Sequence, residues 1–267
     1  MAEPALSRLR DRLPINPPYT GLVAEGYDTW IPVDSPLEEE PVYRRLLDGI
    51  DGTILELGCG TGRPLLRWLA AGYDLEGIDE SADMLAILAA HAAAMDLHPV
   101  VHEGDMAPLA LDRTYAAIVC PAGTFMLVDD EVRASSALAS YMAHLQPGGL
   151  LAMTLAAPGE DAAGRGEGSE LIWRIRRTGS RADGTTIVVH EATTLDASQH
   201  RIVVYDRVES YDTDGRLQDT VLRRHHLRWW SRSEFESLLD DCGFESVRSI
   251  GDDTGWVAVA HAPAGSR

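Results

Sequence analysis

Lysine is absent from this sequence of 267 residues, so all 23 of its Lys-or-Arg positions are arginine. Enzymes that form a Schiff base with a carbonyl substrate or with pyridoxal phosphate need a lysine amine. The phosphate-binding loop of nucleoside triphosphatases needs a lysine that reaches the β- and γ-phosphates. The absence of lysine therefore excludes both classes of protein.

Positive charge is scarce overall. The chain has 42 acidic residues against 23 basic ones, which gives a formal net charge of −19. A protein that binds nucleic acid needs clustered cations to displace counterions from phosphates, and anionic membranes likewise attract basic segments. We therefore expect no nucleic acid and no membrane as partner, and a neutral or cationic small molecule suits the charge better.

Cysteine and long apolar runs are also scarce. Cys59, Cys120 and Cys242 are odd in number, far apart and without metal-ligand spacing, so we expect neither a disulfide framework nor a metal site. No apolar run approaches the roughly 18 residues of a membrane span. The opening stretch MAEPALSRLRDRLP carries scattered charges rather than the apolar core of a secretory signal. These features predict a reduced, cytoplasmic protein.

Short apolar runs alternate with helical patterns after a proline-broken start. We expect helices at 22–30, 37–47, 64–71, 82–95 and 131–145, and strands at 53–57, 74–78, 99–102, 115–120 and 150–155. Alternation of this kind predicts βαβ units around a parallel sheet. Pro147-Gly148-Gly149 is expected to close the helix before the last of these strands.

The pattern changes beyond residue 158 to β-rich segments separated by turn signals such as Asp183-Gly184. These segments, at 171–177, 185–194, 201–211 and 220–228, predict antiparallel hairpins. Ser231 and Glu234 then fit a capping box that opens a last helix, with strands expected at 244–250 and 256–261. The predicted fold is α/β, a doubly wound Rossmann-like sheet with an inserted antiparallel β cap. Its parts are an arm or lid (1–36), an α/β domain (37–157 and 229–267) and the cap (158–228).

A glycine-rich turn follows the first predicted strand of the sheet, in the stretch Glu56-Leu57-Gly58-Cys59-Gly60-Thr61-Gly62. Glycines at such a turn let the backbone approach a ligand and leave helix amides pointing at it. The dinucleotide fingerprint G-x-G-x-x-G would need a glycine where Arg63 stands, which counts against an NAD or FAD site.

Two further elements follow the next strands. Asp79 ends the second strand, about 20 residues after the glycine turn, where a carboxylate can accept hydrogen bonds from ribose hydroxyls. Gly104-Asp105-Met106 follows the third strand, where an acid could meet an adenine amine. Carboxyl ends of neighbouring strands meet at one edge of such a sheet, so these elements predict a ligand site there.

With these elements in place, the stretch ILELGCGTGRPLLRWLAAGYDLEGIDESADML and the later HEGDM closely resemble the class I S-adenosylmethionine (SAM)-dependent methyltransferases. The order of arm, core and cap resembles the small-molecule branch of that family, which includes glycine and amino-sugar N-methyltransferases. The resemblance runs from about Gly26 to His261 and is strongest over Ile54–Asp105. It implies SAM as cofactor, S-adenosylhomocysteine as product, and an N or O nucleophile of a small metabolite as acceptor.

The resemblance also implies residue roles. Glu56 would organise the glycine turn, Asp79 would hold the ribose, and Met84 and Met106 would flank the adenine. The full implied cofactor set is Tyr27, Trp30, Glu56, Gly58, Cys59, Gly60, Asp79, Glu80, Met84, Asp105, Met106, Cys120 and Pro121. Some relatives place an arginine in the arm for the SAM carboxylate; here the matching stretch is Glu38-Glu39-Glu40-Pro41, and we expect Arg63 to take that role.

The reaction needs little from side chains beyond in-line positioning and a path for a proton. His225 and His226 in the last cap strand are the candidate general bases, on opposite faces because strand side chains alternate. We favour His226, since Arg228 and Trp230 on its face could shape a pocket. Thr124 and Phe125, just past the fourth strand, are the other expected substrate contacts.

Simpler interpretations remain open for several of these residues. Cys59 and Cys120 fit small buried side chains, Arg63 fits a solvated helix position, and the two histidines fit ordinary strand positions. Rival functions are C-methylation on the same fold, a SAM-binding regulator or partner protein without catalysis, and an NAD-dependent oxidoreductase. The cap hairpins are also compatible with a homodimer, which the sequence does not decide.

Overall fold

The computed structural model describes residues 12–158 and 172–265. Its centre is a seven-stranded sheet with the order β10-β11-β5-β4-β1-β2-β3. The strands are β1 (Ile54–Leu57), β2 (Leu75–Asp79), β3 (Val100–Glu103), β4 (Tyr115–Cys120), β5 (Leu145–Ala156), β10 (Glu245–Gly251) and β11 (Gly255–His261). Strands β1 to β5 pair in parallel, and β11 pairs antiparallel with both β5 and β10. The predicted doubly wound sheet is confirmed.

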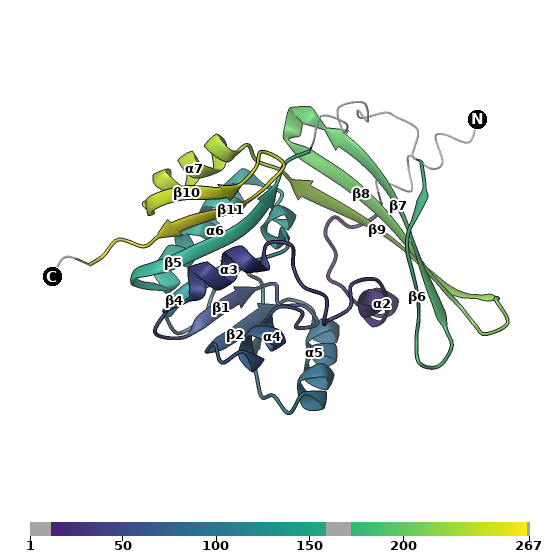
Figure 1. Cartoon of the computed structure of the whole chain (residues 1–267). Coiled ribbons are helices and arrows are strands. Elements are labelled where there is room, and N and C mark those ends of the chain that lie inside the picture. Colours follow the sequence, from purple (N-terminus) through teal and green to yellow (C-terminus); the bar gives the residue numbers. More distant parts are fainter. Residues whose placement is uncertain (1–11, 159–171, 266–267) are drawn as a thin grey trace.

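Helices cover both faces of this sheet (Figure 1). One layer holds α3 (Glu40–Leu47), α4 (Leu65–Ala70) and α5 (Ala82–Ala94), and the other holds α6 (Glu131–His144) and α7 (Arg232–Asp241). Side chains alternate along a strand, so Val119 of β4 packs in the first layer and Ile118 in the second. A strand buried on both faces reads as a continuous apolar run, which explains the sequence of β4.

The start of β5 differs from the prediction. The chain passes directly from α6 into β5 at Leu145, so Pro147-Gly148-Gly149 lies inside the strand instead of before it. The pairing with β4 shifts register between Tyr115 and Ala117, and Gly148 has a φ of 76°. The three residues therefore form an irregularity within a strand. Proline and glycine also end helices, so the sequence pattern did not distinguish the two cases.

A second sheet of four antiparallel strands lies beside the α/β core (Figure 1). It consists of β6 (Arg174–Ser180), β7 (Thr186–Asp196), β8 (Arg201–Tyr211) and β9 (Leu217–Arg228), in that order. These strands are the expected cap. The short helix η3 (Ala197–Gln199) joins β7 to β8. The exact domain boundaries at residues 158 and 229 stay predictions.

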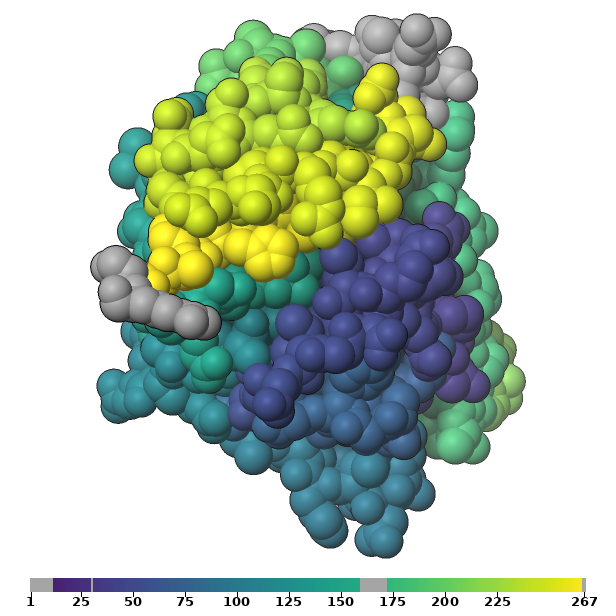
Figure 2. Space-filling view, turned by 60° about the vertical axis from the view of Figure 1, so that its left-hand side comes forward, coloured from purple at the N-terminus to yellow at the C-terminus, as the bar shows by residue number. Residues whose placement is uncertain are grey.

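Helix α2 (Leu22–Trp30) of the arm packs against the cap. Its Leu22 and Val23 share an apolar cluster with Ile187 and Val189 of β7. Figure 2 shows that the segment around α3 and the yellow C-terminal segment lie side by side on one surface of the core. Ser231 and Glu234 form the predicted capping box at α7. Among the described residues, no helix combines the length and the hydropathy needed to cross a bilayer.

Candidate functional site

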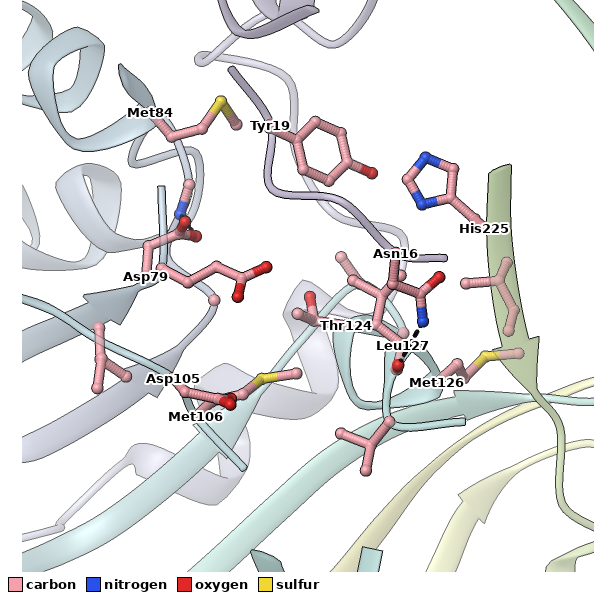
Figure 3. Close-up of a pocket in the computed structure, with 18 of the residues that line it drawn as sticks. Asn16, Tyr19, Asp79, Met84, Asp105, Met106, Thr124, Met126, Leu127 and His225 are labelled. Atoms are coloured by element: carbon pink, nitrogen blue, oxygen red, sulfur yellow. Dashed lines mark hydrogen bonds between the residues drawn. The ribbon is translucent and has the colours of Figure 1, made fainter. Parts of the chain in front are cut away.

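A cavity of about 550 Å³ opens where β1, β2 and β4 end, enclosed by the core, the arm and the cap. Figure 3 shows Asp79, Met84 and Asp105 on its core side, with Met126 and His225 towards the cap. The strand order reverses between β1 and β4, the point at which doubly wound sheets bind their ligands. The site therefore lies at the edge that the sequence predicted.

The glycine turn brings backbone directly to the cavity wall. Gly58 and Gly60 both line it, with φ values of 66° and 53°. A Cβ added at Gly58 would clash with Cγ2 of Thr124, the first residue of the short helix η1 (Thr124–Leu127). Both the backbone angle and the close approach thus require glycine at this position.

Asp79 is held in one orientation at the end of β2. Its Oδ2 accepts a hydrogen bond from the Gly60 amide at 2.8 Å, and its Oδ1 accepts one from the Ser81 amide at 2.9 Å. Burial raises the pKa of Asp79, and the two amide hydrogen bonds oppose that rise. The carboxylate also faces the cavity, with lone pairs left for a ligand's hydroxyl groups.

The far core side holds the residues expected near an adenine. Glu80, Met84, Asp105 and Met106 all line the cavity. Arg133 of α6, which the sequence did not single out, donates to Asp105 Oδ2 at 2.7 Å. Asp105 is therefore an ion-paired carboxylate at the wall.

Several expected cofactor residues lie behind the wall. Cys59, Cys120 and Pro121 are buried and none is among the residues that line the cavity. Cys59 packs against Gly77 of β2, where an added Cβ would lie 2.7 Å from its Sγ. The simpler interpretation of the two cysteines, as small buried side chains, accounts for these positions.

Glu56 also lies behind the glycine turn and is only 1% exposed. Within the described ranges 12–158 and 172–265, its Oε2 has no hydrogen-bond partner. Burial raises its pKa well above the ordinary value, while the nearby Arg63 charge opposes the rise. Arg63 itself is half-buried and does not line the cavity. Its expected contact with the SAM carboxylate stays a prediction.

Replacing Glu56 by glutamine should therefore stabilise the ligand-free protein, and increasingly so as the pH rises. In the unfolded chain the carboxyl ionises near its ordinary pKa, whereas in the fold its raised pKa keeps the proton. The native state then binds more protons than the unfolded state, so this group lowers stability as the pH rises from the unfolded pKa towards the folded one. Glutamine removes that loss. Thermal unfolding of the variant and the unaltered protein at pH 5 and pH 8 measures the gain, since 1 kcal/mol shifts Tm by about 2–4 °C. A Tm difference that is equal at both pH values would contradict the prediction.

Two aromatic residues of the arm form part of the wall. Tyr27, expected from the sequence, and Tyr19, which was not, are both lining residues, and their rings meet edge to face at 5.6 Å. Burial raises the pKa of both phenols. Trp30 ends α2, and its side chain lies outside the part of the chain that the structure describes.

The histidine facing the cavity is His225. It is 4% exposed, and its ring stacks on Tyr19 with centroids 5.8 Å apart. Neither ring nitrogen makes a hydrogen bond with the part of the chain that the structure describes, although Nε2 lies 3.3 Å from Asp206 Oδ2, within ion-pair distance. His226 instead points to the other face of β9, where Nδ1 lies 3.2 Å from Asp129 Oδ2. The two rings lie on opposite faces of β9, as expected. The residue favoured as general base, His226, lies on the face that turns away from the cavity.

The expected substrate contacts divide in the same way. Thr124 lines the cavity, whereas Phe125 is fully buried in the core against Phe235. Arg228 and Trp230 line a separate depression, with the guanidinium carbon 4.2 Å from the Trp230 ring centroid. They share the face of His226, so they do not reach the cavity.

Asn16 joins the arm to both the cap and the core. Its Nδ2 donates to the carbonyl oxygens of Leu127, at 2.7 Å, and His226, at 3.1 Å, and its Oδ1 accepts from the His226 amide at 2.7 Å. Its φ of 46° is a conformation that asparagine tolerates better than most residues. Nothing in the proline-broken sequence around it signals this role.

Glu39 is the least expected wall residue. It comes from the stretch that replaces the arginine of some relatives, and it lines the cavity just before α3. Its Oε1 accepts hydrogen bonds from the Ala122 amide at 2.9 Å and from Thr154 Oγ1 at 3.0 Å. The neighbouring Glu40 instead pairs with Arg67 at 2.6 Å and has a structural role.

Comparison with known proteins gives a consistent result. Residues 54–149 match the family model described as a methyltransferase domain. The chain is 30% identical over 175 residues to the dTDP-3-amino-3,6-dideoxy-alpha-D-glucopyranose N,N-dimethyltransferase of Streptomyces fradiae, covering 60% of this chain and 66% of that protein. It is 29% identical over 164 residues to the cypemycin N-terminal methyltransferase of a Streptomyces species, covering 57% and 65%. The matches thus span just under two thirds of the length of these relatives.

The fold has close counterparts as well. The structure of the CcbJ methyltransferase from Streptomyces caelestis aligns with a TM-score of 0.69 at 23% identity, covering 91% of this chain and 96% of that one. The glycine turn and the anchored Asp79, at the switch point of the sheet, both lie within the region that matches the methyltransferase domain.

Proposed function

We propose that this protein transfers the methyl group of SAM to a nitrogen of a small-molecule amine. The observation that carries the proposal is one continuous cavity that runs from Asp79, past Gly58 and Thr124, to His225 and Leu227 of the cap. Such a cavity has room for a cofactor at one end and an acceptor at the other. When bound, SAM supplies a sulfonium methyl group that is already activated for transfer.

The core end of the cavity fits the chemistry of SAM. Pockets for ligands of this size usually enclose about 300–1,000 Å³ and combine apolar walls with a few fixed polar groups. Here the thioether side chains of Met84 and Met106 supply apolar wall, and Asp79 supplies a fixed carboxylate. These three residues would hold the adenosine part of the cofactor.

Nitrogen is favoured over oxygen and carbon as the acceptor by charge and by similarity. The charged lining residues are Glu39, Asp79, Glu80, Asp105 and Arg133, an excess of negative charge that suits an amine. One of the relatives described above is named as an N,N-dimethyltransferase and the other as an N-terminal methyltransferase. C-methylation on the same fold stays an alternative that the identity of the product would decide.

The arm would close the cavity over its ligands and exclude water. Asp28 of α2 accepts a hydrogen bond from Thr61 Oγ1 at 2.8 Å, and it lies 3.1 Å from His91 Nε2 of α5. The Asn16 hydrogen bonds hold the other end of the arm. Bringing donor and acceptor together in a water-poor site is the main contribution a methyltransferase has to make.

Two other functions are less well supported. A SAM-binding regulator would need no acceptor space, yet the cavity continues beyond Thr124 to Ala156 and Leu227. An NAD-dependent enzyme would need a third glycine where Arg63 stands. Pairing of two copies through the cap stays a prediction, which the molar mass of the purified protein, measured by static light scattering, would check.

Calorimetric titration with SAM, S-adenosylhomocysteine and NAD tests the proposal, together with mass spectrometry of amine and phenol panels incubated with SAM. We expect micromolar binding of the two sulfur ligands, none of NAD, and methylated amines as products. Binding of NAD, or exclusive methylation of phenols or carbon acids, would contradict it.

Exchanging each cap histidine for asparagine should separate the two faces of β9. We expect His225→Asn to lower kcat/KM by about 10–100-fold, because the ring forms part of the cavity wall and supports Tyr19. His226→Asn should mainly lower Tm, because Asp129 loses the partner that lowers its pKa. Steady-state kinetics and thermal unfolding of both variants give the comparison. A larger kinetic loss in His226→Asn would restore the original preference.

A further inference from the structure

We infer that the acceptor is an amine with a largely apolar frame and no phosphate group, and that Glu39 receives its nitrogen. The inference rests on the proposed N-methyl transfer and narrows its substrate class. The inferred acceptor differs from the compound for which one relative is named, a dTDP-linked amino sugar. Three features of the described wall support it: a fixed carboxylate, apolar surroundings and few cations.

The Glu39 carboxylate is fixed by its neighbours. The Ala122 amide and the Thr154 hydroxyl both donate to Oε1. The Tyr43 hydroxyl lies 2.9 Å from Thr154 Oγ1 and donates to the Cys120 carbonyl oxygen at 3.2 Å. Tyr43 is fully buried, which locks this chain of hydrogen bonds in place. A carboxylate held in this way is preorganised to accept a hydrogen bond from a substrate N–H.

The surroundings of this carboxylate on the acceptor side are mostly apolar. The lining residues there include Met126, Leu127, Val128, Ala156 and Leu227. The polar side chain of Asn16 is occupied by backbone groups of the core and cap. Beyond Glu39 and the ring nitrogens of His225, a sugar with several hydroxyl groups would find few described side-chain partners here, whereas an apolar frame would gain from burial at roughly 25 cal/mol per Å².

In the described part of the wall, few cations could hold a diphosphate. Among the described residues that line the cavity, Arg133 is the one arginine. Its Nη2 donates to Asp105 at 2.7 Å, and its Nε donates to the Ala107 carbonyl at 2.9 Å. A diphosphate would meet the carboxylates of Glu39, Asp79 and Glu80, while the nearby Arg223 guanidinium stacks on Tyr19 and donates to the Pro17 carbonyl. Burying such an anion unpaired is costly.

Charge movement in the reaction gives the carboxylate a further effect. The acceptor nitrogen uses its lone pair to bond the methyl carbon as the C–S bond breaks, and the sulfur keeps the bonding pair. Positive charge therefore leaves the sulfur and appears on the nitrogen, where the Glu39 carboxylate stabilises it. Before the attack, the ammonium proton passes to this carboxylate and then to water, which frees the lone pair. The alkylated nitrogen keeps its remaining protons and leaves as the ammonium product.

Calorimetry on the protein saturated with S-adenosylhomocysteine tests the inference at pH 8. The probes are 2-phenylethylamine, which is an apolar cation, and dTDP. We expect the amine to bind and dTDP not to bind. Glu39→Gln should weaken amine binding at least tenfold and leave the affinity for S-adenosylhomocysteine within about twofold, because glutamine Oε1 can still accept from Ala122 and Thr154.

Glu38→Gln is the matched control, since Glu38 is the exposed neighbour of Glu39. It should bind the amine like the unaltered protein. Tighter binding of dTDP than of the amine, or equal amine affinity in both variants, would overturn the inference. Turnover with a dTDP-linked amino sugar but not with apolar amines would also overturn it, while leaving N-methyl transfer intact. Methylation of phenols alone would refute the proposed function itself.

Discussion

Asp79→Asn is expected to weaken the binding of S-adenosylhomocysteine by about 100–1,000-fold, as the loss of one or two charge-assisted hydrogen bonds would. The substitution removes the charge that would accept from the ligand's hydroxyl groups. It also leaves one acceptor oxygen where the amides of Gly60 and Ser81 now have two, so one of these amides loses its partner. Calorimetric titration of the folded variant measures the effect.

The pH dependence of binding gives a second measure of the same residue. Burial raises the pKa of Asp79, so its carboxylate gains a proton as the pH falls through that raised value. Affinity in the unaltered protein should decline on this acid limb, and the variant should show no such limb. Asp112→Asn, a change at an exposed position before β4, is the control. Equal affinities of the Asp79 and Asp112 variants would show that the ribose is held elsewhere.

Gly58→Ala should abolish measurable cofactor binding, or reduce it by about 100-fold, for two separable reasons. The positive φ of 66° costs a non-glycine residue about 1–2 kcal/mol. The new methyl group would also meet Cγ2 of Thr124, displacing the glycine turn or η1. Titration with S-adenosylhomocysteine, after circular dichroism has shown the fold intact, provides the test.

A second substitution separates the steric effect from the backbone effect. Thr124→Ser removes Cγ2 but keeps the hydroxyl that donates to the Pro121 carbonyl at 3.0 Å. The double variant Gly58→Ala/Thr124→Ser should therefore recover about tenfold of the lost affinity, leaving the backbone cost. If the double variant binds no better than Gly58→Ala, the close approach of turn and η1 has no part in the loss.

Most of the fold was predictable because its signals are local. Alternating apolar runs gave β1 to β4 and α5 within one or two residues, and the capping box gave the start of α7. The start of β5 was wrong because glycine and proline serve both helix ends and irregular strands, and only the pairing with β4 decides between them. Local pattern cannot express a pairing between distant segments.

The candidate site was predictable on its core side for the same reason. The glycine turn and Asp79 belong to one βα unit and the strand that follows it, so a short sequence motif contains both. Asn16, Tyr19 and Glu39 reach the cavity through contacts with residues far along the chain, such as Leu127, His225 and Thr154. The choice between His225 and His226 likewise depended on how the cap docks, which the period of a strand leaves open.

The insertion of the cap between β5 and the last two strands has a consequence during synthesis. Strand β5 finds its antiparallel neighbour β11 only after about a hundred more residues have been added. At roughly 5–20 residues per second, the apolar β5 would wait several seconds on the ribosome with its outer edge unpaired. An unpaired apolar edge recruits other strands, so we expect the nascent chain to depend on chaperones most strongly while the cap is being made.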